Sequence, residues 1–514
     1  MSIPNLNLWA TLPALSLALG ACFLFLVDVF VPKERKGITA GLAIVGVVVS
    51  FVLSIPGFGI RTIAFGGMFI SDPFTALINV ITLIATFISI LAAYDYLKRA
   101  RIERGEYYPI LLMVASGAMF MGASGDLVIV FIGLELLSIP LYILAGFRRP
   151  DLRSEESAMK YFLLGAFSTG FLVYGIALVY GATGTTNLQQ IFNHVATSDV
   201  VSPFLLLMGA GLLLVSLGFK VAAVPFHMWT PDVYQGAPTP VTAFMSVVAK
   251  VGGFGALLRV LAIAVPTLVL GNIKVEPGQT VTLHAAWQDA VSIIAALTMI
   301  LGNVVAISQR DIKRLLAYSS IAHAGYILMA VAAAGTFQVT ADAAGNQSVS
   351  LVLGQQAIQG ALIYLLAYAF TNIGAFAVAI AVEHDDATGT LLDDFSGLGR
   401  TRPALALAMA VFMLSLTGIP LTAGFVGKWF VFLAALNSGL GLLALIGVLT
   451  SVISAYYYLR VIVKMWLETG EADAKLPTPL SSAVALCAVG TLVIGILPYL
   501  ASSVAQTVTT VALR

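Results

Sequence analysis

Long runs of hydrophobic residues, separated by short polar stretches, cover almost the whole of this chain. The runs are continuous and do not alternate strictly with polar residues, which argues against the strands of an outer-membrane barrel. Lipid offers backbone groups no hydrogen-bonding partner, so runs of about 20 residues are expected to be membrane-spanning helices. We identify fourteen such segments, at residues 8–31, 38–58, 69–95, 107–124, 127–146, 157–181, 203–224, 240–265, 286–307, 312–335, 356–382, 403–436, 440–463 and 480–505. The pattern predicts an all-α polytopic membrane protein of about 14 transmembrane helices.

The composition agrees with this prediction. Of the 514 residues, 59% are hydrophobic and only 10% are charged, whereas roughly a quarter of the residues of a soluble domain are charged. Most of the surface must therefore face lipid, and the formal net charge of +1 argues against a nucleic-acid partner. The first basic residue is Lys33. Because the basic stretch of a signal peptide is missing before the first run, we expect that run to be a retained helix.

Basic residues are distributed unevenly between the predicted loops. With the amino terminus on the outer side, the outer loops hold only three, Arg61, Lys274 and Arg514. The inner loops and helix ends hold eighteen, namely Lys33, Arg35, Lys36, Lys98, Arg99, Arg101, Arg104, Arg148, Arg149, Arg153, Arg310, Lys313, Arg314, Arg400, Arg402, Arg460, Lys464 and Lys475. Cytoplasmic loops carry the excess of basic residues. We therefore expect both termini on the outer, periplasmic side of a cell inner (cytoplasmic) membrane.

Two of the predicted helices are interrupted. The seventh segment runs into Pro225, and the twelfth is too long for one crossing and carries Pro420 near its middle. Discontinuous membrane helices occur where backbone lines a hydrated cavity. We therefore expect helices 7 and 12 to be broken.

The two breaks lie five segments apart, which suggests an internal repeat within a single transmembrane domain of residues 1–514. The repeat comprises residues 107–265 (helices 4–8) and residues 286–463 (helices 9–13). Because five is odd, the second copy is expected to be inverted in the membrane, a plan common among transporters. The weaker sequence matches are Asp126-Leu-Val with Asp311-Ile-Lys and Ser216-Leu217 with Ser415-Leu416.

Ionisable residues stand within several of the apolar segments. Each costs at least a few kcal/mol in a bilayer and so needs a reason. The set comprises Glu135, Lys220, Lys250, His323 and Lys428. Burial lowers the pKa of a lysine in general and a neighbouring carboxylate raises it again, so a lysine between these effects can gain and lose a proton. Arginine cannot, because it essentially never deprotonates. We predict a proton relay.

Structural alternatives remain for each of these residues. The lysines could form ion pairs that hold helices together, or could extend to the membrane surface. For Lys160, near the inner end of its helix, surface extension is as good an explanation as function. We expect Arg259, near the outer end of its helix, to reach the surface. His323 fits either a buried histidine whose hydrogen bonds are satisfied or a member of the relay. It is expected at the same midplane depth as the other ionisable residues, which favours the relay.

Other chemistry is not supported. Cys22 and Cys487 form no C-x-x-C or Cys/His pattern and are too few for an iron–sulfur cluster, so we expect no metal and no redox centre in this chain. A glycine string at residues 439–444 opens a membrane helix without a preceding strand, which argues against a nucleotide site. The polar loop at residues 383–386 could bind a cation, but we expect it to be solvated.

One long motif resembles a known family. Residues 219–241 read Phe-Lys-Val-Ala-Ala-Val-Pro-Phe-His-Met-Trp-Thr-Pro-Asp-Val-Tyr-Gln-Gly-Ala-Pro-Thr-Pro-Val. This stretch, with residues 134–142 and 243–250, is similar to antiporter-like subunit N of respiratory complex I, the proton-pumping NADH:quinone oxidoreductase. The resemblance covers essentially the whole chain. Gln235 departs from the pattern, where a glutamate is common.

The resemblance implies roles for particular residues. Glu135 would pair with Lys220, Lys250 would be the central lysine of helix eight, and Lys428 would lie near the exit side. His323 fits the polar axis that links two half-channels. His227, after the first break, is expected to shape the route by which protons arrive.

The resemblance also implies partners. FMN, iron–sulfur clusters and quinone would belong to other subunits, and this chain would carry no cofactor. Its neighbours would be antiporter-like subunit M, small membrane subunits and lipids. A change in those subunits would alter the Glu135–Lys220 pair and push a proton along Lys250 towards Lys428.

Two other functions are considered. A subunit of a multisubunit cation/proton antiporter would have similar helices without redox activity, but the motif at 219–241 argues against it. A purely structural membrane scaffold predicts that neutralising the lysines impairs assembly and leaves pumping per assembled complex unchanged.

Overall fold

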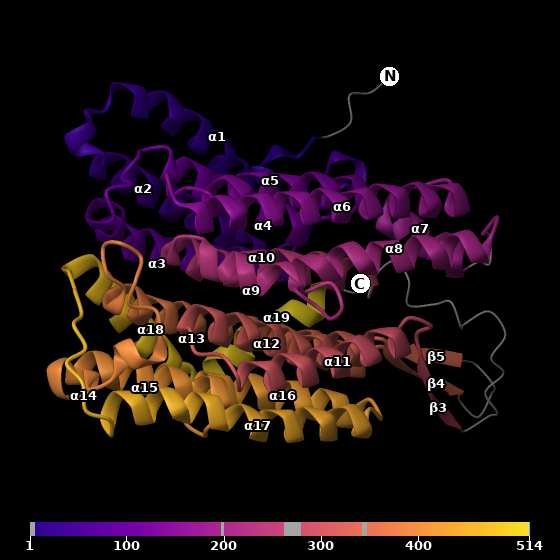
Figure 1. Cartoon of the computed structure of the whole chain (residues 1–514). Coiled ribbons are helices and arrows are strands. Elements are labelled where there is room, and N and C mark those ends of the chain that lie inside the picture. Colours follow the sequence, from indigo (N-terminus) through magenta and orange to yellow (C-terminus); the bar gives the residue numbers. More distant parts are fainter. Residues whose placement is uncertain (1–5, 197–199, 262–278, 342–346, 513–514) are drawn as a thin grey trace.

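A long bundle of helices forms the protein (Figure 1). The computed structural model describes residues 6–196, 200–261, 279–341 and 347–512. The first half contains α1 (Leu8–Phe30), α2 (Gly37–Ser54), α3 (Pro73–Arg99), α4 (Tyr107–Gly122), α5 (Leu127–Ala145), α6 (Leu152–Thr183), α7 (Leu188–Ala196), α8 (Pro203–Val221), α9 (Trp229–Gly236) and α10 (Thr239–Arg259). The second half contains α11 (Gln288–Ala306), α12 (Ile312–Ala334), α13 (Val352–Val382), α14 (Leu398–Thr401), α15 (Pro403–Thr417), α16 (Ala423–Asn437), α17 (Gly441–Trp466), α18 (Thr478–Ile496) and α19 (Pro498–Ala512).

Short strands lie among the loops. An antiparallel pair is formed by β1 (Thr62–Ala64) and β2 (Phe69–Ser71). An antiparallel sheet in the order β3-β4-β5 is formed by β3 (Thr280–His284), β4 (Thr336–Ala341) and β5 (Gln347–Ser350). This sheet projects from one end of the helical bundle (Figure 1).

The prediction of a polytopic helical membrane protein is confirmed. Within the described ranges, 12 helices are long and apolar enough to cross a membrane, and α4, α15 and α16 are shorter apolar helices. Twelve of the fourteen predicted segments each correspond to one α-helix, so hydropathy located the elements well. The total of fourteen crossings stays a prediction.

Some predicted boundaries are wrong. The third segment was expected from residue 69, but Phe69–Ser71 form β2 and α3 begins at Pro73. The cause is Asp72, whose side chain accepts a hydrogen bond from the backbone N–H of Thr75 at 2.8 Å and so caps the helix. The fourteenth segment is two helices, because α18 ends at Ile496 and Pro498 begins α19. The last residues of the eighth predicted segment, 262–265, lie outside the described residues.

Both predicted breaks are present. The helix α8 ends at Val221, where Ala222 takes a left-handed conformation with φ 64°, and the short α9 follows. The helix α15 ends at Thr417, where Gly418 has φ 93°, and α16 follows. Each break leaves the last carbonyl groups of a helix without their usual partners.

The centre of the bundle is made by helices from both halves. In the most apolar 18-residue stretch of each helix, 100% of the residues are buried in α10, 94% in α12 and 89% in α13, against 28% in α6. These three helices pack on one another in the middle of the molecule, with α1 and α2 at one side and α15 and α17 at the other (Figure 1). Polar side chains on α10, α12 and α13 therefore lie far from lipid.

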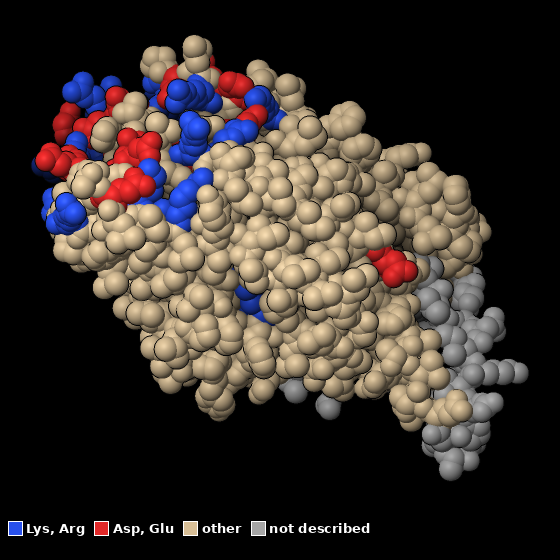
Figure 2. All heavy atoms as spheres, turned by 60° about the horizontal axis from the view of Figure 1, so that its bottom comes forward, with Lys and Arg blue, Asp and Glu red and all other residues tan. Residues whose placement is uncertain are grey.

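Charged side chains gather at one end of the face shown in Figure 2, and the long flank is almost free of them. Ion pairs at helix ends and loops include Lys464–Asp393, Lys475–Asp385 and Arg314–Asp232. A flank without charges is what a lipid-facing surface requires.

Two loops repeat the same local structure. Asp126 precedes α5 and its Oδ2 accepts from Thr186 Oγ1 at 3.0 Å. Asp311 precedes α12 and its Oδ2 accepts from Thr390 Oγ1 at 2.7 Å. In each case the residue after the aspartate donates its N–H to the threonine carbonyl, at 3.0 Å and 2.8 Å. The loop that supplies the threonine follows α6 in the first case and α13 in the second.

Candidate functional site

Three lysines are buried in the core of the bundle. Lys220, Lys250 and Lys428 are 2%, 1% and 4% exposed. Lys220 lies in the last turn of α8, Lys250 in the middle of α10, and Lys428 in the second turn of α16. A buried ammonium group is costly unless its protons are satisfied, so the partners of each lysine define the site.

Lys220 is held by hydroxyl groups. Its Nζ donates to Ser138 Oγ at 2.8 Å and to Tyr161 Oη at 3.2 Å. The expected direct pair with Glu135 is absent from the described part of the chain. The half-buried Glu135 instead accepts a hydrogen bond from Thr169 Oγ1 at 2.6 Å. Ser138 lies one turn beyond Glu135 on α5, so its hydroxyl occupies the position expected for the carboxylate.

Lys250 contacts the first helix break. Its Nζ donates to the backbone carbonyl of Val221, the last residue of α8, at 2.9 Å. The carbonyl end of a helix carries partial negative charge and has unpaired acceptors. No carboxylate lies within ion-pair distance of this ammonium group in the ranges that the structure covers.

Lys428 contacts the second break in the same way. Its Nζ donates to the carbonyls of Leu416 at 3.0 Å and Thr417 at 2.8 Å, and to Ser451 Oγ at 2.7 Å. Gly418 makes this approach possible, because a Cβ there would lie 2.9 Å from Lys428 Cδ. The lysines and the breaks were predicted separately from the sequence, but not that they are partners. The separation of only eight residues between Pro420 and Lys428 was the available signal.

His323 links aromatic hydroxyl groups from two other helices. Its Nδ1 lies 2.6 Å from Tyr364 Oη on α13, and its Nε2 lies 3.1 Å from Tyr458 Oη on α17. Its position in α12 is fully within the core, as predicted. The tyrosines were not among the predicted site residues, because nothing in the local sequence separates them from ordinary core aromatics.

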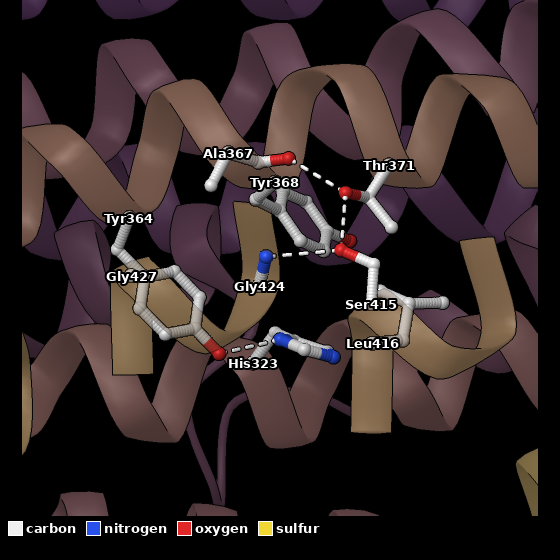
Figure 3. A pocket seen from close by; sticks show the side chains of 9 residues that line it. All are labelled: His323, Tyr364, Ala367, Tyr368, Thr371, Ser415, Leu416, Gly424 and Gly427. Atoms are coloured by element: carbon white, nitrogen blue, oxygen red, sulfur yellow. Dashed lines mark hydrogen bonds between the residues drawn. The ribbon is translucent and has the colours of Figure 1, made fainter. Parts of the chain in front are cut away.

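A small cavity lies beside His323 (Figure 3). It is lined by His323, Tyr364, Ala367, Tyr368, Thr371, Ser415, Leu416, Gly424 and Gly427, and has about 10 Å³ of room for the centres of water molecules. That is close to the space of a single water. Leu416 lines the cavity, and its carbonyl accepts a hydrogen bond from Lys428, so the cavity adjoins the second helix break.

The other residues considered from the sequence lie apart from Lys220, Lys250, His323 and Lys428 or play different roles. His227 is half-buried in the loop after α8, and none of its contacts in the described part joins it to the lysines. Its Nδ1 is buried without a hydrogen-bond partner there. The side chain of Lys160 is 41% exposed, and its Nζ forms ion pairs with Glu156 and Asp232, each at 2.7 Å.

The expectation that Arg259 reaches the surface is wrong. Arg259 is 3% exposed, and its Nη2 donates to Asp72 Oδ1 at 2.6 Å and to Thr75 Oγ1 at 2.8 Å. Its Nε donates to the carbonyl of Gly122 at 3.1 Å. A guanidinium shared by α3, α4 and α10 is satisfied inside the protein and gains nothing from extension to the surface.

Metal ligation is not apparent at the site. Among the described residues, no group of three or more His, Cys, Asp and Glu side chains is placed to hold a metal ion. The arrangement consists of lysines, hydroxyl groups, one imidazole and backbone carbonyls. Such groups can bind and pass protons.

Known proteins share both the sequence and the fold. The family model for NADH:quinone oxidoreductase/Mrp antiporter transmembrane proteins matches residues 123–454. NADH-quinone oxidoreductase subunit N of Chloroflexus aggregans is 44% identical over 506 residues, covering 97% of this chain and 96% of the relative.

Two solved structures show how far the fold extends. A chain of respiratory complex I from Thermus thermophilus has 32% identity and a TM-score of 0.76, covering 96% of this chain and 98% of that chain. A chain of the Mrp complex from a Dietzia species has 20% identity and a TM-score of 0.80, covering 98% and 97%. The fold is thus common to both kinds of complex, whereas the high identity is to N subunits. This chain belongs to the family of NADH-quinone oxidoreductase N subunits, multi-pass membrane proteins of complex I.

Proposed function

We propose that this chain translocates protons as a non-redox subunit of an NADH:quinone oxidoreductase, through Lys220, Lys250, His323 and Lys428. The observation that carries the proposal is the pairing of Lys250 and Lys428 with the carbonyl ends of two broken helices. Both lysines are buried, and both lie in helices that follow a break.

Carbonyl partners suit a lysine that must release its proton. A buried lysine in a direct ion pair leaves an uncompensated carboxylate when it becomes neutral, which is strongly unfavourable. A carbonyl carries no net charge, so the neutral amine leaves no isolated ion behind. The hydrogen bonds to Val221, Leu416 and Thr417 therefore hold the ammonium group in place without fixing its charge.

The pathway is assembled from both halves of the chain. Glu135 and Ser138 on α5 supply the surroundings of Lys220, and Lys250 follows on α10. His323 and the adjoining cavity connect the centre to Lys428. The matching aspartate–threonine loops before α5 and α12 support the inverted repeat of residues 107–265 and 286–463. We assign His227 no step in this pathway, because none of its contacts in the described part of the chain joins it to the lysines.

Electron transfer is assigned to partner subunits. NADH oxidation, with FMN and iron–sulfur clusters, and quinone reduction would occur there, and this chain would respond to them. The neighbouring membrane subunits, among them antiporter-like subunit M and small subunits, would cover part of its apolar flank, and lipid the rest. The basic residues favour a cytoplasmic membrane with both termini outside.

A redox-free cation/proton antiporter remains the other candidate, because the Mrp chain has the same fold. The 44% identity to a subunit N over nearly the whole chain favours the oxidoreductase. Copurification with flavin and iron–sulfur subunits would distinguish the two.

The proposal is tested by NADH-driven proton uptake in inverted membrane vesicles. Lys250→Ala, compared with the parent at matched levels of assembled complex, should lower both NADH oxidation and proton uptake at least fivefold. The matched control is Lys464→Ala, because Lys464 pairs with Asp393 and Glu468 at the charged end and should pump normally. Unchanged NADH oxidation and proton uptake in assembled Lys250→Ala complex would make Lys250 structural.

A further inference from the structure

Glu383 is a buried carboxylate at the charged end of the molecule that the pathway above does not use. It follows the last residue of α13 and is 2% exposed, whereas His384, Asp385 and Asp386 after it are exposed. Its Oε1 accepts a hydrogen bond from Tyr96 Oη on α3 at 2.9 Å. Its Oε2 is buried and has no hydrogen-bond partner within the described part of the structure.

Basic groups from three neighbouring elements surround this carboxylate without contacting it. Lys313 on α12 and Arg148 before α6 are 5% and 8% exposed, and the charge of Glu383 acts on Lys313. Lys313 Nζ donates to the carbonyl of Ala237 at 2.7 Å, and Arg99 on α3 donates to the carbonyl of Ile380. In the described ranges none lies within ion-pair distance of Glu383. Their charges offset that of the buried carboxylate, and its Oε2 has no hydrogen-bond partner in the described part.

Polar groups lead from Glu383 to the start of α10. The Tyr96 hydroxyl that binds Glu383 faces the start of α10, where the backbone N–H of Thr239 acts on it electrostatically. The Oγ1 of Thr239 is buried and without a hydrogen-bond partner in the described part. Thr239 is therefore the next group in line after Tyr96.

From Thr239 the polar groups continue along α10 to Lys250. Ser246 and Lys250 lie seven and eleven residues after Thr239, spacings that place all three on one side of the helix. Ser246 Oγ accepts a hydrogen bond from Asn372 Nδ2 on α13 at 2.6 Å. Asn372 lies eleven residues before Glu383, and α10 packs against α13. Polar groups of α10 and α13 thus lie at both ends of this eleven-residue stretch. Ser246 and Asn372 lie at one end, and Thr239 and Glu383 lie at the other.

Unpaired buried polar atoms mark this route. Besides Glu383 Oε2 and Thr239 Oγ1, the Oδ1 of Asn372 is buried without a partner in the described part. Buried polar atoms are ordinarily satisfied, and ordered water is the usual partner when no protein group is available. The rise of α10 separates Thr239 from Ser246 by about 10 Å and Ser246 from Lys250 by about 6 Å, distances that a few hydrogen-bonded waters can bridge.

We propose that Glu383 receives protons at the charged end of the molecule and passes them, through water held by Thr239, Asn372 and Ser246, to Lys250. This inference rests on the proposed function, since it supplies the protons that Lys250 passes on. The carboxylate accepts at Oε2 one proton that enters from the aqueous phase at the charged end, and it gives this proton to an internal water. Each water in the chain releases one proton as it accepts another, and the neutral amine of Lys250 takes the last. The carboxylate is then ready for the next proton.

The other explanation for the cluster is structural, with Glu383 present only to neutralise Lys313 and Arg148. Glu383→Gln separates the two explanations, because the amide keeps the hydrogen bond from Tyr96 but cannot carry a proton. Glu383→Asp keeps the proton-carrying group. Asp385→Asn is the matched control, because Asp385 is an exposed neighbour that pairs with Lys475.

The experiment measures NADH-driven proton uptake per assembled complex in inverted vesicles, for the parent and the three variants. The pH of the external medium, which bathes the charged end in such vesicles, is varied. Glu383→Gln should reduce uptake at least fivefold and change its dependence on the pH of the charged side. Glu383→Asp should keep more than half of the uptake, and Asp385→Asn should match the parent. Reduced assembly of Glu383→Gln with normal uptake per assembled complex would overturn the inference.

Comparison with Lys250→Ala separates failure of this inference from failure of the proposed function. If Lys250→Ala stops pumping while Glu383→Gln pumps normally, protons reach Lys250 by another route and only the role of Glu383 is overturned. If neither variant alters pumping, the proposed function itself fails.

Discussion

Lys250 and Lys428 differ from the buried Arg259 in the kind of partner they have. Arg259 in the same protein has a carboxylate partner, Asp72, at 2.6 Å. Lys250 and Lys428 have carbonyl groups of helix ends. An ion pair stabilises one charge state, and a carbonyl tolerates both. At the residue scale, the proposed pathway uses lysines whose carbonyl partners leave no isolated counter-ion in either charge state.

The role of Gly418 can be tested at this scale. Gly418 and Gly439 both have positive φ, of 93° and 77°, so alanine at either position costs about 1 kcal/mol of backbone strain. At Gly418 the added Cβ also meets Lys428, whereas at Gly439 nothing lies within 4 Å. We expect Gly418→Ala to lower proton uptake per assembled complex severalfold and Gly439→Ala to leave it unchanged. Equal uptake by the two variants would show that the position of Lys428 does not matter.

The residues of the site were predictable in part. The ionisable side chains stand out because they interrupt apolar segments. Their partners come from helices distant in sequence, so the tyrosines around His323 and the carbonyls of α8 and α15 could not be predicted. Arg259 was misjudged for the same reason, because Asp72 lies 187 residues away in the chain.

At the scale of elements, hydropathy located the helices, and local capping decided where they begin and end. The apolar pattern continues through Phe69–Ser71 and through Leu497, yet Asp72 and Pro498 start new helices there. Hydropathy averages over many residues and cannot register a single capping side chain or proline. The breaks after α8 and α15 were predicted because proline and glycine interrupt long runs.

One contact between elements has a defined pH dependence. Asp232 on α9 accepts hydrogen bonds from Lys160 on α6 and Arg314 on α12, both at 2.7 Å. Although partial burial of Asp232 opposes the change, these two bonds hold the pKa of its carboxyl below the ordinary value. A carboxyl with a lowered pKa in the folded state stabilises it above the unfolded pKa of about 3.9, and this contribution is lost as the pH falls through the folded pKa.

Asp232→Asn should therefore lower thermal stability slightly at pH 7, by less than about 1 kcal/mol because the site is partly exposed. The difference between parent and variant should shrink as the pH falls below about 4. Thermal unfolding of the purified complex across this pH range measures it. A difference that stays constant with pH would mean that the ion pairs do not link α6, α9 and α12 in the way described.

At the scale of the whole molecule, the fold alone does not separate an oxidoreductase subunit from an antiporter subunit. The Mrp chain superposes with a TM-score of 0.80 at 20% identity, and the Thermus complex I chain with 0.76 at 32%. The bundle provides a buried core with two broken helices, and under the proposed function the complex around it determines what drives the protons. The motif at residues 219–241 was therefore more informative about function than the architecture.

In the proposed pathway Lys250 acts by releasing and accepting a proton and not only by filling a charged position. Lys250→Arg distinguishes these two roles, because arginine keeps a positive charge and hydrogen-bond donors but essentially never deprotonates. NADH-driven proton uptake would be measured in inverted vesicles at matched assembly, with Lys464→Arg as the control. We predict that Lys250→Arg assembles and yet loses at least four-fifths of the uptake, while Lys464→Arg pumps normally. Uptake by Lys250→Arg at the parent rate would exclude proton release by Lys250 as a step in pumping, because a permanently charged side chain would then suffice.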